Sequence, residues 1–144
     1  MKLPRATRHG LHPIRSYAVV GSHSPAYATA TGKALLAWQT EAEIIRVSQS
    51  AVQLTDTTLI GVDALLAQAA EIRQTGIAIN RGEWRSGVWG IAAPVFGRDR
   101  LAVAAIGVTG PCDRIESQID TFAAAVSAVA RELSAYHGAL SMSA

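Results

Sequence analysis

Two β-prone runs joined by a tight turn constrain the fold of this chain more than any other feature. They lie between Gly82 and Pro111 and meet at Gly97-Arg98-Asp99-Arg100, a sequence that suits a β-hairpin turn. Strands joined by so short a connection pair antiparallel. The same stretch holds four further glycines, Gly87, Gly90, Gly107 and Gly110. Because glycine gives up side-chain packing in a strand, these positions predict bulges or the close approach of another group.

Helical patterns surround the hairpin. Three helices are predicted, over 32–38, over 40–47 with Thr40 as the cap, and over 60–76 with Gly76 as a C-terminal stop. A long amphipathic helix is predicted over 114–138, ended by Gly138, with an apolar stripe of Ile115, Ile119, Phe122, Val126, Val129 and Leu133. Short strands are predicted at 14–21 and 77–80. This order of elements predicts an α+β fold, in which helices pack on an antiparallel sheet.

The length of 144 residues fits a single domain. No repeat or linker divides the chain, so residues 14–144 are expected to form one domain after an irregular basic arm at 1–13. The first fifteen residues carry four basic residues and no acid, whereas the remainder has nine basic and eleven acidic residues. A solvated end explains this arm better than nucleic-acid contact, because the body shows no basic stripe with interleaved aromatic residues.

Cysteine content and hydropathy indicate the compartment. Cys112 is the only cysteine, which excludes an internal disulfide and suits a reducing environment. No apolar run approaches the ~20 residues that span a bilayer. The basic N-terminus is not followed by the apolar core of a signal peptide. We therefore expect a cytoplasmic protein that does not contact a membrane.

A catalytic or metal-binding constellation is not visible in the sequence. The histidines, His9, His12, His23 and His137, form no metal-binding spacing with the cysteine. Cys112 lies in Gly-Pro-Cys-Asp-Arg and is best explained as an inert thiol, although it stands near a predicted helix start. The acidic residues are spread out, and no pair suggests general acid–base work. We expect no catalytic residue, metal or cofactor.

Three segments in order resemble the effector-binding domain of IclR-type bacterial transcription regulators. They are "SPAYATATGKALLAW" (24–38), "GIAINRGEWRSGVWGIAAPVFG" (76–97) and "LAVAAIGVTGPCDRI" (101–115). No single motif is specific, but the ordered set is, and the resemblance runs from about Ile14 to His137. It implies a GAF- or profilin-like sheet with helices, which holds a small organic effector between the sheet and its loops. It also implies regulation of catabolic genes for carboxylic or aromatic acids, and a homodimer or homotetramer.

The chain departs from the family pattern at its N-terminal side. Members normally carry a winged helix-turn-helix that reads DNA, and this domain is absent from the sequence. The first helix and strands of the effector domain are also missing, because Met1 falls just before about the third sheet strand of the pattern. We therefore expect an N-terminally truncated chain, with DNA binding confined to a domain that it lacks.

The resemblance implies effector contacts at six positions, Ala30, Thr31, Asn80, Gly90, Gly107 and Thr109, and Trp84 is a candidate aromatic lid. The N–H groups of Ala30 and Thr31 stand at a helix start, where unpaired donors suit a carboxylate. Asn80 occupies a family position that is often Asp, and an amide tolerates an anionic ligand without charge repulsion. Glu83 matches an acidic family position and is expected to hold the loop instead of the ligand.

Gly90 and Gly107 replace larger polar side chains of the family. We expect them to leave volume above the sheet, which favours an aromatic or longer acid over a two- or three-carbon acid. Simpler explanations remain open: an ordinary capped helix start at Ala30, a turn residue at Asn80, and glycines that relieve crowding or form bulges.

Two other functions remain open. The chain could be a dimerising remnant that binds no ligand, since the first strands of the family pattern are missing. It could also be a small enzyme that uses Cys112 or a histidine, although no polar constellation supports this alternative.

Overall fold

The computed structural model describes residues 21–142, with side chains described through Gly138. The arm expected at 1–13 and nearly all of the strand expected at 14–21 lie outside the described residues, so both remain expectations.

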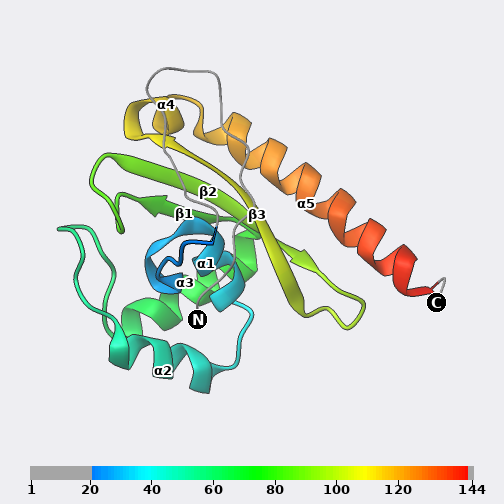
Figure 1. Cartoon of the computed structure of the whole chain (residues 1–144), viewed down its shortest axis with the longest axis horizontal. Helices are drawn as coiled ribbons and strands as arrows, with labels where there is room; N and C mark the ends of the chain where they lie inside the picture. Colours follow the sequence, from blue (N-terminus) through cyan, green and yellow to red (C-terminus); the bar gives the residue numbers. More distant parts are fainter. Residues whose placement is uncertain (1–20, 143–144) are drawn as a thin grey trace.

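The predicted hairpin supplies the central strand and one edge strand of a three-stranded antiparallel sheet (Figure 1). Strand β1 is Ala78–Arg81, β2 is Val88–Phe96 and β3 is Ala102–Pro111, in the order β1-β2-β3. The turn between β2 and β3 is closed by the Gly97 N–H, which donates to the Leu101 carbonyl at 2.8 Å. The register shifts between Val95 and Phe96, which marks a bulge near this turn. The predicted α+β fold is confirmed.

The first helices begin and end close to the predicted caps. A short 3₁₀ turn, Ala26–Ala28, precedes α1, Ala30–Leu36. Helix α2 is Glu41–Ser50, and the Thr40 side chain accepts a hydrogen bond from the Glu43 N–H, as its capping role predicts. Helix α3 is Val62–Thr75 and ends at Gly76, whose φ of 75° lies in the left-handed region.

The prediction of one long C-terminal helix is wrong in two details. The structure has α4, Cys112–Ser117, and α5, Ile119–Met142, separated at Gln118, where φ is −129°. Apolar periodicity continues across this break, so the pattern did not predict an interruption at Gln118. Gly138 does not end the helix, because α5 continues past it to Met142.

Helices cover both faces of the sheet (Figure 1). Helix α1 packs against all three strands, with α2 and α3 beyond it, and α5 runs along the other face of β2 and β3. Strand β2 alternates between two cores: Ala92 joins the core under α1, whereas Ala93 and Val95 join the core under α5. This two-sided burial explains why six consecutive residues of β2, from Gly90 to Val95, are buried.

The predicted stripe on the C-terminal helix is only partly buried. Val126 and Ala130 pack on the sheet and are almost inaccessible, whereas Val129 and Leu133 are 39% and 40% exposed. The expected core role of Val129 and Leu133 is therefore wrong. Helical periodicity identified an apolar face, but only part of that face packs against the described sheet.

Candidate functional site

Four of the predicted contact residues lie together at the middle of the sheet. Asn80 pairs with Gly90, and Gly90 pairs with Thr109. Residues directly opposite each other in antiparallel strands share a face, so these three form one row across the sheet. Ala30, the first residue of α1, lies over this row, because a Cβ placed on Gly90 would meet the Ala30 Cβ at 3.3 Å. We call Asn80, Gly90 and Thr109 the central row.

Gly90 and Gly107 do not leave free volume in the way that was expected. A Cβ on Gly90 would meet the Thr109 Cγ2 at 3.1 Å as well as Ala30. A Cβ on Gly107 would meet the Ile91 carbonyl oxygen at 2.6 Å and the Ala92 Cβ at 2.9 Å. The proposed reason for these glycines is therefore corrected: both allow close packing of the protein itself, which removes the support for an aromatic or longer acid.

The start of α1 is capped, as the simpler explanation proposed. The Thr29 hydroxyl accepts a hydrogen bond from the Gly32 N–H at 3.3 Å, and the Thr29 carbonyl accepts one from the Lys33 N–H at 2.8 Å. The preceding N–H groups, of Ala30 and Thr31, have no acceptor within the helix. Ala30 is buried and Thr31 is half-buried.

The Asn80 side chain closes a tight turn through its amide oxygen, whereas its amide nitrogen takes no part in the turn. Its side chain is 5% exposed, and Oδ1 accepts a hydrogen bond from the Glu83 N–H at 2.8 Å. Gly82 between them has a φ of 77°, a conformation that favours glycine. The Nδ2 group makes no hydrogen bond to another described residue. The turn role of Asn80 is thus present, and two amide donors remain unused.

A buried ion pair, Lys33 with Glu83, lies beside Asn80. The Lys33 Nζ donates to the Glu83 Oε1 at 2.6 Å and to the Ile79 carbonyl at 2.5 Å. Both residues are almost completely buried. Burial lowers the pKa of Lys33, and the negative charge of Glu83 partly opposes this shift. The Glu83 Oε2 is buried without a hydrogen-bond partner among the described residues.

The pair confirms that Glu83 holds its loop, but sequence reasoning missed Lys33. The available signal was a lysine inside the otherwise apolar run Gly-Lys-Ala-Leu-Leu. A lysine surrounded by core residues requires a partner for its charge.

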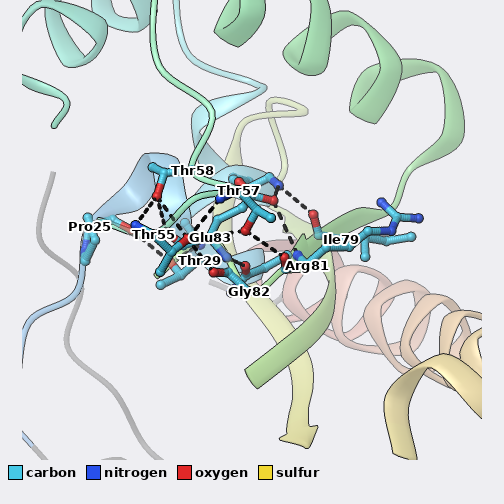
Figure 2. Close-up of polar contacts among 12 residues, drawn as sticks. Pro25, Thr29, Thr55, Thr57, Thr58, Ile79, Arg81, Gly82 and Glu83 are labelled. Carbon is cyan, nitrogen blue, oxygen red and sulfur yellow. Dashed lines mark hydrogen bonds and ion pairs between the residues drawn. The ribbon is translucent and has the colours of Figure 1, made fainter. Parts of the chain in front are cut away.

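Three threonines of the α2–α3 loop hold the same connection by its carbonyl groups (Figure 2). Their hydroxyls donate one bond each, from Thr55 to Gly82 at 2.7 Å, from Thr57 to Arg81 at 3.0 Å and from Thr58 to Glu83 at 2.6 Å. The Thr58 hydroxyl also accepts the N–H groups of Leu54 and Thr55. No pattern in the sequence predicted a role for this Thr-Asp-Thr-Thr run. It makes the β1–β2 connection a fixed support for Asn80.

Gly107 and Trp84 lie outside the central row. Gly107 pairs with Ala92, one step further along the same face of the sheet, and is exposed. Trp84 follows Glu83, is half-buried against the core under α1, and carries the Arg85 guanidinium 4.4 Å from its ring centroid. A lid role for Trp84 therefore stays a prediction.

Two hollows lie near these elements, and neither is lined by the seven predicted residues. One has a volume of about 340 Å³ and lies between residues 23–27 and α2. The other, of about 10 Å³, lies beside Lys33 between α1 and α3. Thr31 and Thr109, which lie beside Ala30 and in the central row, retain access to solvent.

The described residues were also compared with the requirements of a metal site and of a membrane-spanning helix. Residues 21–142 contain no cluster of three or more histidine, cysteine or acidic residues able to hold a metal ion. In the same range no helix combines the length and apolar character needed to cross a bilayer.

Cys112 donates a hydrogen bond to the Asp113 carboxylate at 3.4 Å, and this contact raises the pKa of the thiol.

A family model, the C-terminal domain of the bacterial transcriptional regulator IclR, matches residues 9–135. The chain belongs to the IclR family. It corresponds to the C-terminal, effector-binding domain of these regulators. The HTH-type transcriptional regulator KdgR of Escherichia coli K12 is 30% identical over 131 residues, which are 89% of this chain and 50% of KdgR. BhcR of Paracoccus denitrificans, another HTH-type regulator, is 35% identical over 124 residues, 84% of this chain and 44% of BhcR.

Solved structures of the IclR family share the fold. The C-terminal domain of E. coli KdgR superposes with a TM-score of 0.75 at 30% identity, covering 83% of this chain and 74% of that domain. The Agobacterium tumefaciens repressor BlcR gives a TM-score of 0.77 at 28% identity, covering 84% of this chain and 51% of BlcR. The chain spans about half the length of the curated relatives that it matches.

Proposed function

We propose that this IclR domain senses a small organic carboxylate, aliphatic or aromatic, bound beside the central row and the start of α1. The observation that supports the proposal is the Asn80 side chain, whose Oδ1 is bound within its turn while Nδ2 makes no hydrogen bond to another described residue. The Thr109 and Thr31 side chains lie on the accessible side of the same region.

In the intact regulator, the ligand would act by binding one arrangement of subunits more tightly than another. DNA contact would come from a helix-turn-helix domain, and the effector-binding domain would form a homodimer or homotetramer. The names of the relatives support the DNA contact, since KdgR and BhcR are HTH-type regulators.

A second candidate is an interaction module that binds no small molecule. The packing of Ala30 over Gly90 favours it, because protein atoms occupy the space that was expected to hold a ligand. An enzyme that uses Cys112 has less support, because its thiol bonds to a carboxylate that raises the pKa and the relatives are named as regulators.

Thermal unfolding in the presence of aliphatic and aromatic carboxylates separates these candidates. A ligand that binds the native state at one hundred times its Kd stabilises the protein by about 2.7 kcal/mol. We expect at least one carboxylate to raise Tm in a concentration-dependent manner, and Asn80→Ala to remove the shift. The absence of any shift across the panel would leave the interaction module.

A further inference from the structure

The outer edge of β3 is open in the part of the chain that the structure describes. Strand β3 pairs with β2 on one side, and no other described strand pairs with its opposite side. Residues 101–110 contain no charged residue and no proline. Natural proteins usually protect an edge strand with lysine, proline or a bulge, and here only the bulge beside Val95 and Phe96, close to the turn, does so. The regular stretch 104–110 therefore has the features of an edge that accepts a further strand.

Every second residue of β3 directs its backbone groups toward this open edge. A Cβ on Gly107 would lie 2.9 Å from the Ala92 Cβ, and opposite side chains come closest at pairs that share no ladder hydrogen bonds. Ala105 is opposite Pro94, which has no N–H and so costs no ladder bond at a pair of this kind. It follows that Ala105, Gly107 and Thr109 direct their N–H and C=O groups away from β2.

Helix α5 places apolar side chains on the same side of the molecule. Ser134 accepts a hydrogen bond from the Phe96 N–H of the central strand β2. By helical spacing Val129 and Leu133 project from the opposite flank of α5, and both are partly exposed. Since α5 packs over β2 and β3, this opposite flank lies toward β3 and its open edge (Figure 1). A strand added to β3 would thus gain backbone hydrogen bonds and an apolar cover together.

The charges at the two ends of β3 indicate which strand fits. The turn before β3, residues 98–100, carries two arginines and one aspartate, whereas α4, which follows β3, carries two acidic residues and one arginine. Antiparallel pairing of β3 with its own copy places each basic end beside an acidic end, and parallel pairing would place like charges together. We propose that the outer edge of β3 pairs antiparallel with β3 of a second copy, about a two-fold axis near Gly107, with the two α5 flanks covering the joined sheet.

This inference rests on the homodimer of the proposed function and names its surface, but it requires no carboxylate. One strand edge and one helix flank make a small contact, so we expect a Kd of about 10 μM or weaker. The dilute protein is then monomeric, which allows one sample to be measured in both states.

Hydrogen exchange followed by NMR tests the pairing residue by residue, with sedimentation equilibrium reporting the dimer. When the protein is concentrated from well below to well above the Kd, exchange at the N–H groups of Ala105, Gly107 and Thr109 should slow by about tenfold. The N–H groups of Ile106 and Val108 bond to β2, so they should be protected at both concentrations. A dimer without slowed exchange at the first three residues overturns the proposed surface. Equal protection at every concentration also overturns it, because a segment of the same chain would then cover the edge.

A lysine on the edge should oppose the pairing. Val103, 51% exposed at the start of β3, becomes lysine in Val103→Lys, and Val52→Lys in the α2–α3 loop is the matched control at 59% exposure. We expect Val103→Lys to weaken the dimer by about tenfold, because the change enters a two-fold contact twice, and Val52→Lys to change the Kd by less than about twofold. Equal effects of the two substitutions would refute the edge as the contact.

A charge exchange tests the direction of pairing. Arg100→Asp and Asp113→Arg should each weaken the dimer by about threefold, since each opposes an ion pair that occurs twice, and the double variant should regain the wild-type Kd. Tm of the dilute monomer checks that each variant folds. A double variant weaker than both single variants contradicts antiparallel self-pairing. A wild-type protein that stays monomeric at every concentration refutes the homodimer of the proposed function as well, whereas the carboxylate-induced rise in Tm tests sensing separately.

Discussion

At the residue scale, Gly90 and Gly107 show how one residue type admits two physical explanations. Both stand in a sheet, where glycine gives up packing unless something approaches closely. At each position the atoms that approach belong to the protein: Ala30 and Thr109 at Gly90, and β2 at Gly107. The glycines therefore set how closely α1 and the strands pack.

Gly107→Ala should destabilise the domain by about 1–3 kcal/mol, because the new methyl group must displace a backbone carbonyl. Gly138→Ala in α5 is the control, since nothing lies within 4 Å of its added Cβ. A glycine inside a helix costs about 0.5–1 kcal/mol relative to alanine, so this control should gain stability. Urea unfolding measures both free energies, and equal effects would refute the packing explanation.

At the element scale, α5 illustrates the difference between an apolar face and a buried face. The face predicted from periodicity includes Val126, Val129 and Leu133, but only Val126 is buried against Ala93 and Val95. Ser134 on the same helix accepts a hydrogen bond from the Phe96 N–H at 2.9 Å and anchors the end of β2. The contact line of α5 therefore follows Val126, Ala130 and Ser134.

Val126→Ala should lower the free energy of unfolding by about 1–3 kcal/mol, since it removes two buried carbon groups and leaves a cavity. Leu133→Ala should change it by less than about 1 kcal/mol, although more carbon is removed, because Leu133 is already 40% exposed in the folded state. Denaturant unfolding of the two variants decides the matter. A larger loss for Leu133→Ala would mean that a partner surface covers this flank in solution.

At the scale of the whole molecule, the buried ion pair and the cysteine thiol each make contacts within the domain. Lys33 and Glu83 bond to each other and to the backbone. Cys112 begins α4, where its own N–H donates to the Gly87 carbonyl and its thiol to Asp113. Support for the proposed sensing role comes from the relatives, which are named as transcriptional regulators.

Cys112→Ser should leave carboxylate binding unchanged and should shift the free energy of unfolding by less than about 1 kcal/mol. The hydrogen bond to Asp113 raises the pKa of the thiol and so disfavours the thiolate that nucleophilic chemistry requires. Calorimetric titration with benzoate and acetate measures the binding. Conversion of either probe by the wild type but not by this variant would show that the domain is an enzyme.

The sequence by itself determined the hairpin, the cap at Thr40, the C-terminal stop at Gly76 and the α+β class. These features depend on local backbone preferences and on apolar periods, which each segment carries regardless of its neighbours. The family resemblance also came from the sequence, because its three segments lie in the same order as in the IclR pattern.

Only the tertiary structure decided how Asn80 is supported, why Gly90 lacks a side chain and which part of α5 is buried. Lys33 and Glu83 lie fifty positions apart in the chain, and α1 reaches Gly90 only through the packing of a helix on a sheet. Such contacts depend on distances between elements, and periodicity along one segment contains no information about what its faces meet. The break at Gln118 has the same origin, since it reflects where the chain must turn over the sheet.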